Sequence, residues 1–385
     1  METREPRDVH VLASRMRQVA SKFRADHPLS APRWNSGTYP LATNVQGRPD
    51  TKTLVWFPSP GCFWSLSGGC TMCDFGSNPQ AQSVDSALSD FDALIERLDP
   101  GVQHIHIAPG GSFLSDQEVP PELRRGVMQR VERLRFLRSV GIETRPNLLT
   151  KRKLLELINS LPTQVQHLTV GFGFECLTDI VREVSIYKGY GRSHVEAAIR
   201  VINAVNADQA HLDITFEVYV MLKPLFLSEQ EAIDEALRTI DWCYAAGAET
   251  AVLFLNTIKR NTIQAYMAER ADLMPPLHYQ PPYYRSAIQV LRQLTPTQRQ
   301  RTAVLGVQSG VLADGMPRGC PLCTPFLLGA LMAHNFTRDP SILDHAANSI
   351  CPCRDAWLED LLVPGEDLRS RIYHGLEILE QAFSK

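Results

Sequence analysis

The chain has 385 residues, of which 44% are hydrophobic and 21% charged, with a formal net charge of −3. This length and composition suit a globular protein with one large domain and a smaller appendage, and the negative charge does not indicate a nucleic-acid binder. No apolar run approaches the ~20 residues of a membrane span and METREPRDVH lacks the apolar core of a secretory signal, so we expect a cytoplasmic protein with no membrane partner.

The chain is predicted to begin with a helical preamble over residues 1–48, a helix at Val9–Ala25 and then a loop punctuated by proline and glycine. Short apolar runs then alternate with amphipathic stretches, a pattern typical of strand–helix units and a parallel sheet. Six such units are too few for a closed eight-fold barrel. We therefore predict an α/β fold with an open partial (βα)6 barrel over residues 49–303 and its chemistry at the carboxyl ends of the strands. The expected strands are Thr53–Phe57, His104–Ala108, Val140–Thr144, His167–Phe172, Ile214–Leu222 and Ala251–Leu255, and the expected helices are Ser83–Leu98, Pro121–Leu137, Lys151–Leu161, Ser193–Val205 and Ser228–Ala246.

The last third of the chain follows a different pattern. A further helix is expected at Tyr283–Leu294, after two consecutive prolines. From about Val304 the sequence is rich in glycine, proline and cysteine, and we predict a C-terminal module over residues 304–385 that ends in a helix at Leu368–Ser384.

Nine cysteines in a reducing compartment argue against a disulfide framework. Two of them, Cys176 and Cys243, stand alone and are interpreted as buried apolar residues. The other seven fall in two groups, which is typical of metal binding. The groups are Cys62, Cys70 and Cys73, and Cys320, Cys323, Cys351 and Cys353.

The first group follows the first expected strand directly. Three thiolates can hold three irons of a [4Fe–4S] cluster and leave the fourth iron open for S-adenosylmethionine. Within this segment Met72 is predicted to pack on the adenine of that cofactor, and Phe75, with neighbouring aromatic residues, to shield the cluster. The alternative is a zinc site completed by a distant histidine, and the cysteine spacing alone does not separate the two.

A second signal lies at the end of the next strand, where Gly110-Gly111-Ser112 follows Pro109. Two glycines allow the backbone to approach a ligand closely, and Ser112 could bind the methionine amino group. The alternative is a tight turn between strand and helix. One βα unit after a three-cysteine segment, the glycine pair favours the cofactor site.

The sequence resembles the radical S-adenosylmethionine subunit of archaeosine synthase, within the wider group that includes the radical domain of the elongator acetyltransferase. The resemblance covers about Thr53 to Leu361. This sequence departs from the family pattern at two places: it has Asp74-Phe75 where the family is expected to have Gly-Tyr, and Gly110 where the family is expected to have Ser. The matching stretches are Gly61–Phe75, Gly110–Pro120, Gly141–Pro146, Gly171–Glu175, Tyr187–Tyr190, Glu217–Leu225, Gln280–Pro282 and the late cysteine pairs.

The resemblance implies the partial barrel, the [4Fe–4S] cluster with an open iron, and cleavage of S-adenosylmethionine to a 5′-deoxyadenosyl radical that abstracts hydrogen. In the archaeosine enzyme this chemistry breaks a C–N bond in a lysine arm on a 7-deazaguanine base in tRNA. Such an enzyme is expected to take its electron from a reductant such as flavodoxin or ferredoxin.

Polar residues at the strand ends are the remaining site candidates. Glu143 and Arg145 are predicted to contact the cofactor, Arg145 by pairing its carboxylate; alternatively they form a buried structural ion pair. Glu175 could bind the cofactor ribose. Glu175 and Lys223 are the candidate catalytic residues, although Lys223 could equally snorkel from the barrel rim.

The second cysteine group offers four thiolates in two pairs and no open position, so it is expected to be structural or to relay electrons. An auxiliary [4Fe–4S] cluster and zinc both fit this ligand set. The first is preferred because an enzyme assembled with one cluster already has access to that machinery.

Ten basic residues crowd the segment from Arg124 to Lys153. They could bind tRNA phosphates, or they could be the solvated face of barrel helices, which the overall charge favours. We therefore predict a radical enzyme that acts on a small biosynthetic metabolite and drives bond cleavage or rearrangement. The alternatives are an archaeosine-synthase-like reaction on tRNA and a non-enzymatic, zinc-binding RNA adaptor.

Overall fold

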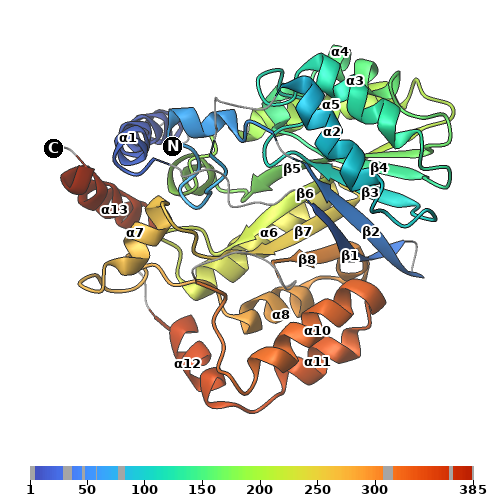
Figure 1. The fold of residues 1–385 in the computed structure, drawn as a ribbon. Helices are drawn as coiled ribbons and strands as arrows, with labels where there is room; N and C mark the ends of the chain where they lie inside the picture. Colours follow the sequence, from blue (N-terminus) through green and yellow to red (C-terminus); the bar gives the residue numbers. More distant parts are fainter. Residues whose placement is uncertain are drawn as a thin grey trace.

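The computed structural model describes residues 5–28, 37–45, 48–57, 59–76, 83–306, 315–363 and 367–383. Its centre is a single eight-stranded sheet whose strands follow one another in chain order (Figure 1). The first two strands are antiparallel, and all later neighbours are parallel. The strands are β1 Gly37–Val45, β2 Arg48–Trp56, β3 His104–Ala108, β4 Ser139–Glu143, β5 His167–Glu175, β6 Asp213–Leu222, β7 Thr250–Leu255 and β8 Thr302–Leu305.

The predicted parallel α/β architecture is confirmed, since all six expected strands appear as β2 to β7. Two strands were not expected. Strand β1 lies in the segment predicted as loop, where it forms a hairpin with β2 and carries Pro40, a residue that an edge strand tolerates because its outer side needs no N–H donor. Strand β8 is a short addition beside β7.

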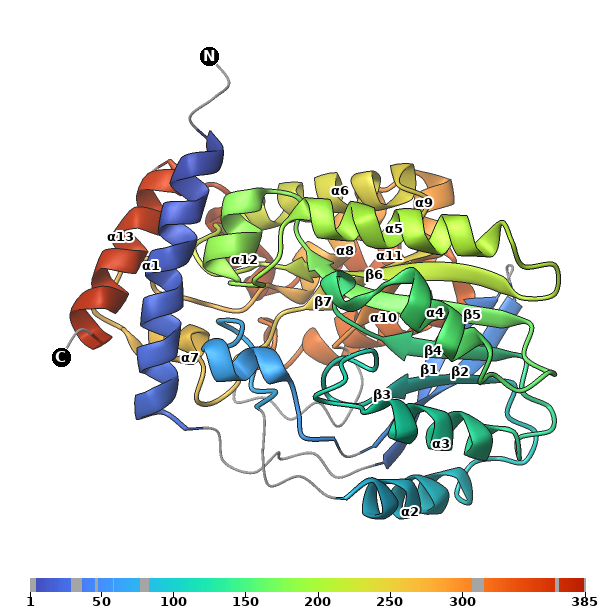
Figure 2. The ribbon, with the colours of Figure 1, turned by 90° about the horizontal axis from the view of Figure 1, so that it is seen from above.

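Helices cover the outer face of the curved sheet (Figures 1 and 2). Their starts follow local capping signals: Ser228 and Glu231 exchange side chain–backbone hydrogen bonds of 3.3 and 2.8 Å at the beginning of α6. The helices are α1 Glu5–Asp26, α2 Val84–Ile95, α3 Pro121–Val131, α4 Lys151–Ile158, α5 Arg192–Asn206, α6 Glu229–Ala245, α7 Ile263–Glu269, α8 Tyr284–Gln293, α9 Pro296–Arg301, α10 Thr324–Thr337, α11 Pro340–Ala347, α12 Pro352–Leu361 and α13 Leu368–Phe383, with short turns η1 Phe63–Ser67, η2 Pro146–Leu148 and η3 Val181–Ser185.

Helix α10 packs against both edges of the sheet, namely β8 on one side and β1 and β2 on the other. Its Asn335 side chain accepts from Val304 N (2.8 Å) and donates to Val304 O (2.7 Å), as a neighbouring strand would. An exposed strand edge is a site for unwanted pairing. The C-terminal module therefore covers the opening of the barrel, and β8 crosses the boundary expected at residues 303 and 304.

The first and last helices, α1 and α13, lie side by side at one end of the barrel (Figure 2). Arg15 of α1 pairs with Glu380 of α13 at 2.7 Å, and the ring of Phe23 packs edge-on against Phe383 at 5.1 Å. The predicted preamble helix is thus part of the same body as the barrel. Within the described residues, every helix is too short or too polar to cross a membrane.

Candidate active site

The first cysteine group lies on residues 59–76, here called the cluster loop, which follows β2 at the carboxyl edge of the parallel strands. The turn η1 separates Cys62 from Cys70 and Cys73, and all three are free thiols. Since one loop supplies all three sulfurs, the ligand set depends on how that loop is held.

One side of the cluster loop is fastened to the segment after β5. Trp64 donates from its indole nitrogen to Tyr187 O (3.0 Å), and Thr71 donates to Ser185 O through its hydroxyl (2.6 Å). Gly189 has a φ of +71°, and a Cβ there would lie 2.2 Å from the Trp64 ring. Glycine at this position is therefore required for the indole to reach its partner.

The other side of the cluster loop is covered by α1. Gly68 packs so tightly on this helix that a Cβ would lie 2.6 Å from the Cβ of Ala20. Arg24 of α1 reaches Gly68 O at 3.5 Å and Asn261 O at 3.1 Å. The preamble helix thus packs against one side of the loop and helps to hold it, a role that its sequence did not indicate.

Glu118, which the sequence analysis did not single out, joins the cluster loop to residues 109–113, here called the glycine loop. Its carboxylate accepts from Phe63 N (2.9 Å) and, through a short contact, from Ser112 N. Burial raises the pKa of this carboxyl group, and the two backbone donors oppose that shift. Its place in GGSFLSDQEVP, a stretch of the resemblance, was the one available signal.

Two of the three thiols, Cys62 and Cys73, sit where a negative charge is costly. Desolvation, followed by the Glu118 carboxylate, raises the pKa of Cys62 to about 12. Desolvation likewise raises the pKa of Cys73 to about 11, with the Lys259 ammonium acting in the opposite direction. Thiolates are stabilised there by a bound cationic centre, so the donor set of three soft sulfurs fits an iron–sulfur cluster.

In the glycine loop, Gly111 packs closely against both Glu118 and the backbone of Cys62. A Cβ on it would lie 2.2 Å from Glu118 Oε2 and 3.3 Å from the Cα of Cys62. Ser112 is buried, and its hydroxyl accepts from Arg145 N at 3.2 Å. Gly110 has a φ of +68°. The structure thus brings the predicted residues Gly110, Gly111 and Ser112 against the cluster loop.

Glu143 and Arg145 have separate partners instead of pairing with each other. The Arg145 guanidinium lies 4.7 Å from the Trp64 ring and 4.9 Å from the Tyr190 ring, and it donates to Lys188 O at 2.8 Å. Arg145 therefore sits beside the cluster loop, where it could pair a carboxylate. Glu143 accepts from the Tyr219 hydroxyl at 2.9 Å inside the barrel.

Glu175 ends β5 with a φ of +69° after a bulge in the sheet. Its carboxylate pairs with Lys188 Nζ at 2.9 Å, and both side chains are largely buried. A Cβ on Gly173 would lie 2.3 Å from Glu175 Oε1 and 2.8 Å from Lys188 Nζ. The glycine therefore makes room for this ion pair beside Arg145.

The inner wall of the barrel carries a polar group that the sequence analysis missed. His106 of β3 is buried, with its ring nitrogens 3.3 Å from Glu143 and 3.5 Å from Glu217. Glu217 also pairs with Lys52 at 3.1 Å and accepts from Tyr219 at 3.2 Å. Alternation along β3 and β6 places these side chains on one face, but the partners come from four different strands.

The two other cofactor candidates lie at the end of the cluster loop. Met72 and Phe75 are both half-buried, and Met72 packs against the core. The Phe75 ring meets the Trp56 ring edge-on at 5.6 Å and lies 4.9 Å from Lys259 Nζ. Contact of either residue with a cofactor stays a prediction.

Lys223 is buried at the end of β6 with a φ of +64°. Its ammonium pairs with Glu229 Oε2 at 2.6 Å, and that oxygen also pairs with Arg318 at 2.9 Å. Burial lowers the pKa of Lys223. These contacts connect it to the C-terminal module, and a direct role towards substrate stays a prediction.

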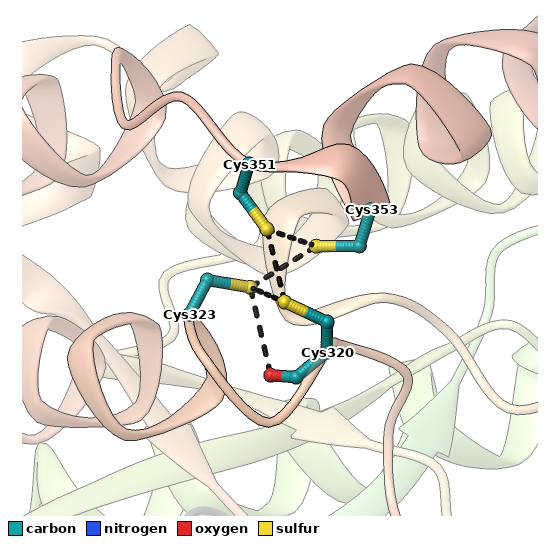
Figure 3. A group of neighbouring side chains, drawn as sticks. All are labelled: Cys320, Cys323, Cys351 and Cys353. Atoms are coloured by element: carbon teal, nitrogen blue, oxygen red, sulfur yellow. Dashed lines mark hydrogen bonds between the residues drawn. The ribbon is translucent and has the colours of Figure 1, made fainter.

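The second cysteine group forms a compact ring, here called the four-cysteine site (Figure 3). The Sγ–Sγ distances are 3.0 Å for Cys320–Cys351 and for Cys323–Cys353, 3.2 Å for Cys351–Cys353, and 3.5 Å for Cys320–Cys323. Among the residues that the structure describes, these four cysteines form the one group of three or more His, Cys, Asp or Glu side chains that are close enough to share a metal ion. The expected closed metal site is therefore assembled.

Much of the basic stretch is neutralised within the fold. Arg124 is buried and pairs with Asp116 at 2.8 Å, Lys153 pairs with the same carboxylate at 3.2 Å, and Arg130 pairs with Asp92 at 2.8 Å. Such pairs favour a structural role for these cations over phosphate binding.

Comparison with known proteins finds related chains over most of the sequence, although no protein-family model matches. The chain is 30% identical over 325 residues to archaeosine synthase subunit beta of Methanosarcina acetivorans, covering 82% of this chain and 86% of that protein. It is 25% identical over 323 residues to archaeosine synthase subunit beta of Thermococcus kodakarensis, covering 82% and 93%.

Among solved structures, the chain is similar to a radical S-adenosylmethionine methyltransferase from Kitasatospora setae, with a TM-score of 0.44 at 12% identity. The similarity covers 80% of this chain and 62% of that one. Methylornithine synthase has a TM-score of 0.45 at 10% identity, covering 79% and 72%. Because both scores are below 0.5, the assignment of the chain rests on its sequence relatives.

Proposed function

Since the chain belongs to the family of archaeosine synthase subunit beta, we propose that it is a radical S-adenosylmethionine enzyme that acts on a small biosynthetic metabolite. The observation that carries this proposal is the cluster loop, which presents three thiols at the carboxyl edge of the sheet and is joined to the glycine loop by Glu118.

Cys62, Cys70 and Cys73 would hold a [4Fe–4S] cluster. When bound, the cluster supplies the electron that cleaves S-adenosylmethionine and releases a 5′-deoxyadenosyl radical. The residues of the chain itself would orient the bound cofactor and hold the cluster loop in place. Arg145 lies beside Trp64, where its guanidinium could pair a carboxylate, and α1 packs against the cluster loop at Gly68.

The inner wall of the barrel would receive the substrate. Glu143, Glu217, Tyr219 and His106 lie close together there, and Glu143 keeps about 29% of its side-chain surface exposed. Carboxylates, a phenol and an imidazole can orient a polar small molecule, and the paired state of the basic stretch supports a substrate without many phosphates.

A second candidate is favoured by the sequence relatives. A chain 30% identical to an archaeosine synthase subunit could carry out C–N bond cleavage on a lysine-bearing 7-deazaguanine in tRNA. It would then use the same cluster loop, and it would need further phosphate contacts on the exposed surface.

Replacing Cys70 by Ala tests the proposal. The anaerobically reconstituted variant, reduced in the presence of S-adenosylmethionine, should form 5′-deoxyadenosine only at the rate found without enzyme, because two thiolates do not hold a cluster with an open iron securely. Chromatographic measurement of 5′-deoxyadenosine is the readout.

Cys243→Ala is the matched control, since Cys243 is buried in α6 far along the chain from the cluster loop, and it should retain cleavage. Full cleavage by the Cys70→Ala protein would contradict the proposal. A colourless wild-type protein holding zinc at the cluster loop would instead favour the RNA adaptor.

A further inference from the structure

We propose that the four-cysteine site holds a single zinc ion rather than an auxiliary [4Fe–4S] cluster, and that this ion clamps the C-terminal module onto the charged residues at the end of β6. The inference concerns a different set of residues from the cluster loop, so it stands or falls separately from the proposed function.

The sulfur spacing distinguishes the two kinds of metal centre. Around one tetrahedral zinc with Zn–S bonds of about 2.3 Å, thiolate sulfurs lie roughly 3.8 Å apart. The four shortest sulfur pairs measure 3.0 to 3.5 Å, so a zinc ion would fit after each pair opened by less than about 1 Å.

A [4Fe–4S] cluster makes a different demand. Each thiolate binds a separate iron at its own corner of the cube, so the four sulfurs surround the cluster instead of one ion. They must then lie much further apart than sulfurs that share a metal. The four Sγ atoms are all within 4.8 Å of one another and form the compact ring of Figure 3. This spacing suits sulfurs that share one ion better than sulfurs at the separate corners of a cube.

The backbone around the sulfurs is already ordered by the fold. Cys323 N and Thr324 N both donate to Cys320 O, at 3.2 and 2.9 Å, which closes the turn before α10. Cys351 caps α12, and Cys353 lies in its first turn. Two tight turns, each at the start of a helix, thus present two sulfurs apiece.

A buried cation lies behind the sulfurs. Arg285 of α8 is 3% exposed and donates to Ser349 O at 3.0 Å, two residues before Cys351. Zinc with four thiolates carries a net charge of about −2, which a buried guanidinium partly offsets.

Both halves of the four-cysteine site lead into one charge network, whose Glu229 and Lys223 are buried. Arg318, two residues before Cys320, pairs with Glu229 at 2.9 Å and with Asp360 of α12 at 2.6 Å. Glu229 in turn holds Lys223 at 2.6 Å. A metal that fixes the start of α12 relative to Cys320 therefore fixes Asp360 relative to Arg318.

Metal analysis of the full-length Cys62/Cys70/Cys73→Ala triple variant tests the identity of the ion. When zinc, iron and sulfide are all supplied, we expect about one zinc per chain and no iron. Iron with sulfide, iron alone, or the absence of any metal would each overturn the proposal.

The wild-type protein provides a measurement that does not depend on the folding of this variant. Zinc X-ray absorption should give four sulfur ligands at about 2.3 Å. A shell containing nitrogen or oxygen, or the absence of zinc, would contradict the assignment. Loss of S-adenosylmethionine cleavage would not bear on either result, so the two proposals fail separately.

The clamp is tested by replacing Cys351 and Cys353 with Ser in the otherwise intact chain. Zinc should be released, and hydrogen exchange should rise in α12 and around Arg318 while β3 to β6 keep the protection of the wild type. A zinc-free protein with unchanged exchange in α12 and around Arg318 would show that no clamp exists.

Discussion

The buried carboxylate of Glu118 accepts backbone hydrogen bonds from both the cluster loop and the glycine loop. A charged group away from water needs such donors, because desolvation otherwise outweighs its other interactions. The same carboxylate is the largest charge effect on Cys62 after desolvation itself. One side chain thus links the position of the cluster ligands to the electrostatics around them.

Replacing Glu118 by Gln should affect both properties. The amide keeps the shape but offers one acceptor oxygen instead of two, so one backbone N–H loses its partner at a cost of about 1–3 kcal/mol. Removal of a negative charge beside Cys62 should also make the cluster easier to reduce. An EPR-monitored redox titration should show a more positive potential than in wild type.

Glu122→Gln on the exposed face of α3 is the matched control, because it removes the same charge away from the loops. If Glu118→Gln and Glu122→Gln share one potential and one unfolding midpoint, Glu118 does not hold the loops together.

The pairing of α10 with β8 closes the edge of the sheet with buried polar groups. His334 Nε2 lies 3.0 Å from Thr302 O, and Arg338 donates to the same oxygen at 2.6 Å. Desolvation, with a smaller effect of Arg338, lowers the pKa of His334 to about 4. Burial thus favours the neutral imidazole, which can donate from Nε2 to Thr302 O.

This pKa shift predicts a loss of stability in mild acid. The folded-state pKa lies below the ordinary value of 6.5, so the unfolded chain takes up the proton first and stability falls as the pH drops from about 6.5 towards 4. Between pH 7.5 and 5.5 the His334 contribution should amount to roughly 1.3 kcal/mol. Urea unfolding at the two pH values measures it.

His334→Gln should lack this share of the pH dependence, since its amide can still donate to Thr302 O but does not titrate in this range. His345→Gln, at an exposed position of α11, should behave as wild type. Equal pH dependence in all three proteins would rule out His334 as the source.

The distribution of charge over the whole molecule bears on the choice between a small metabolite and tRNA. The cations paired with Asp92 and Asp116 already have partners. Arg125, Arg135 and Arg138 are exposed cations of the same segment. Lys151 and Arg152 are exposed as well, and their partners Asp208 and Glu156 also lie at the surface. An RNA-binding surface on this segment would use such exposed cations to contact phosphates.

Changing Arg125, Arg135 and Arg138 to Glu should therefore have little effect if the substrate is small. Fluorescence anisotropy with bulk tRNA should give only weak binding, of similar strength in wild type and variant. Binding that is tight in wild type, is lost in the variant, and falls by orders of magnitude between about 50 and 200 mM salt would favour the tRNA reaction.

Much of the barrel could be predicted because its signals are local. Apolar runs of strand length alternate with amphipathic stretches from β2 to α6, and capping residues such as Ser83 and Ser228 mark helix starts. The grouping of the cysteines likewise indicated two separate metal sites, because clustered thiols in a reducing compartment are typical of metal binding.

What only the tertiary structure decided depends on contacts between residues far apart in sequence. Strand β1 exists because β2 pairs with it, despite Pro40 within the strand. Glu118 matters because it reaches Phe63, and His106 because three other strands surround it. The sulfur spacing that favours zinc arises where the turn before α10 meets the start of α12. The local sequence specifies which side chains a segment carries, whereas tertiary packing determines which of these side chains come into contact. The proposed chemistry of this protein depends on those contacts.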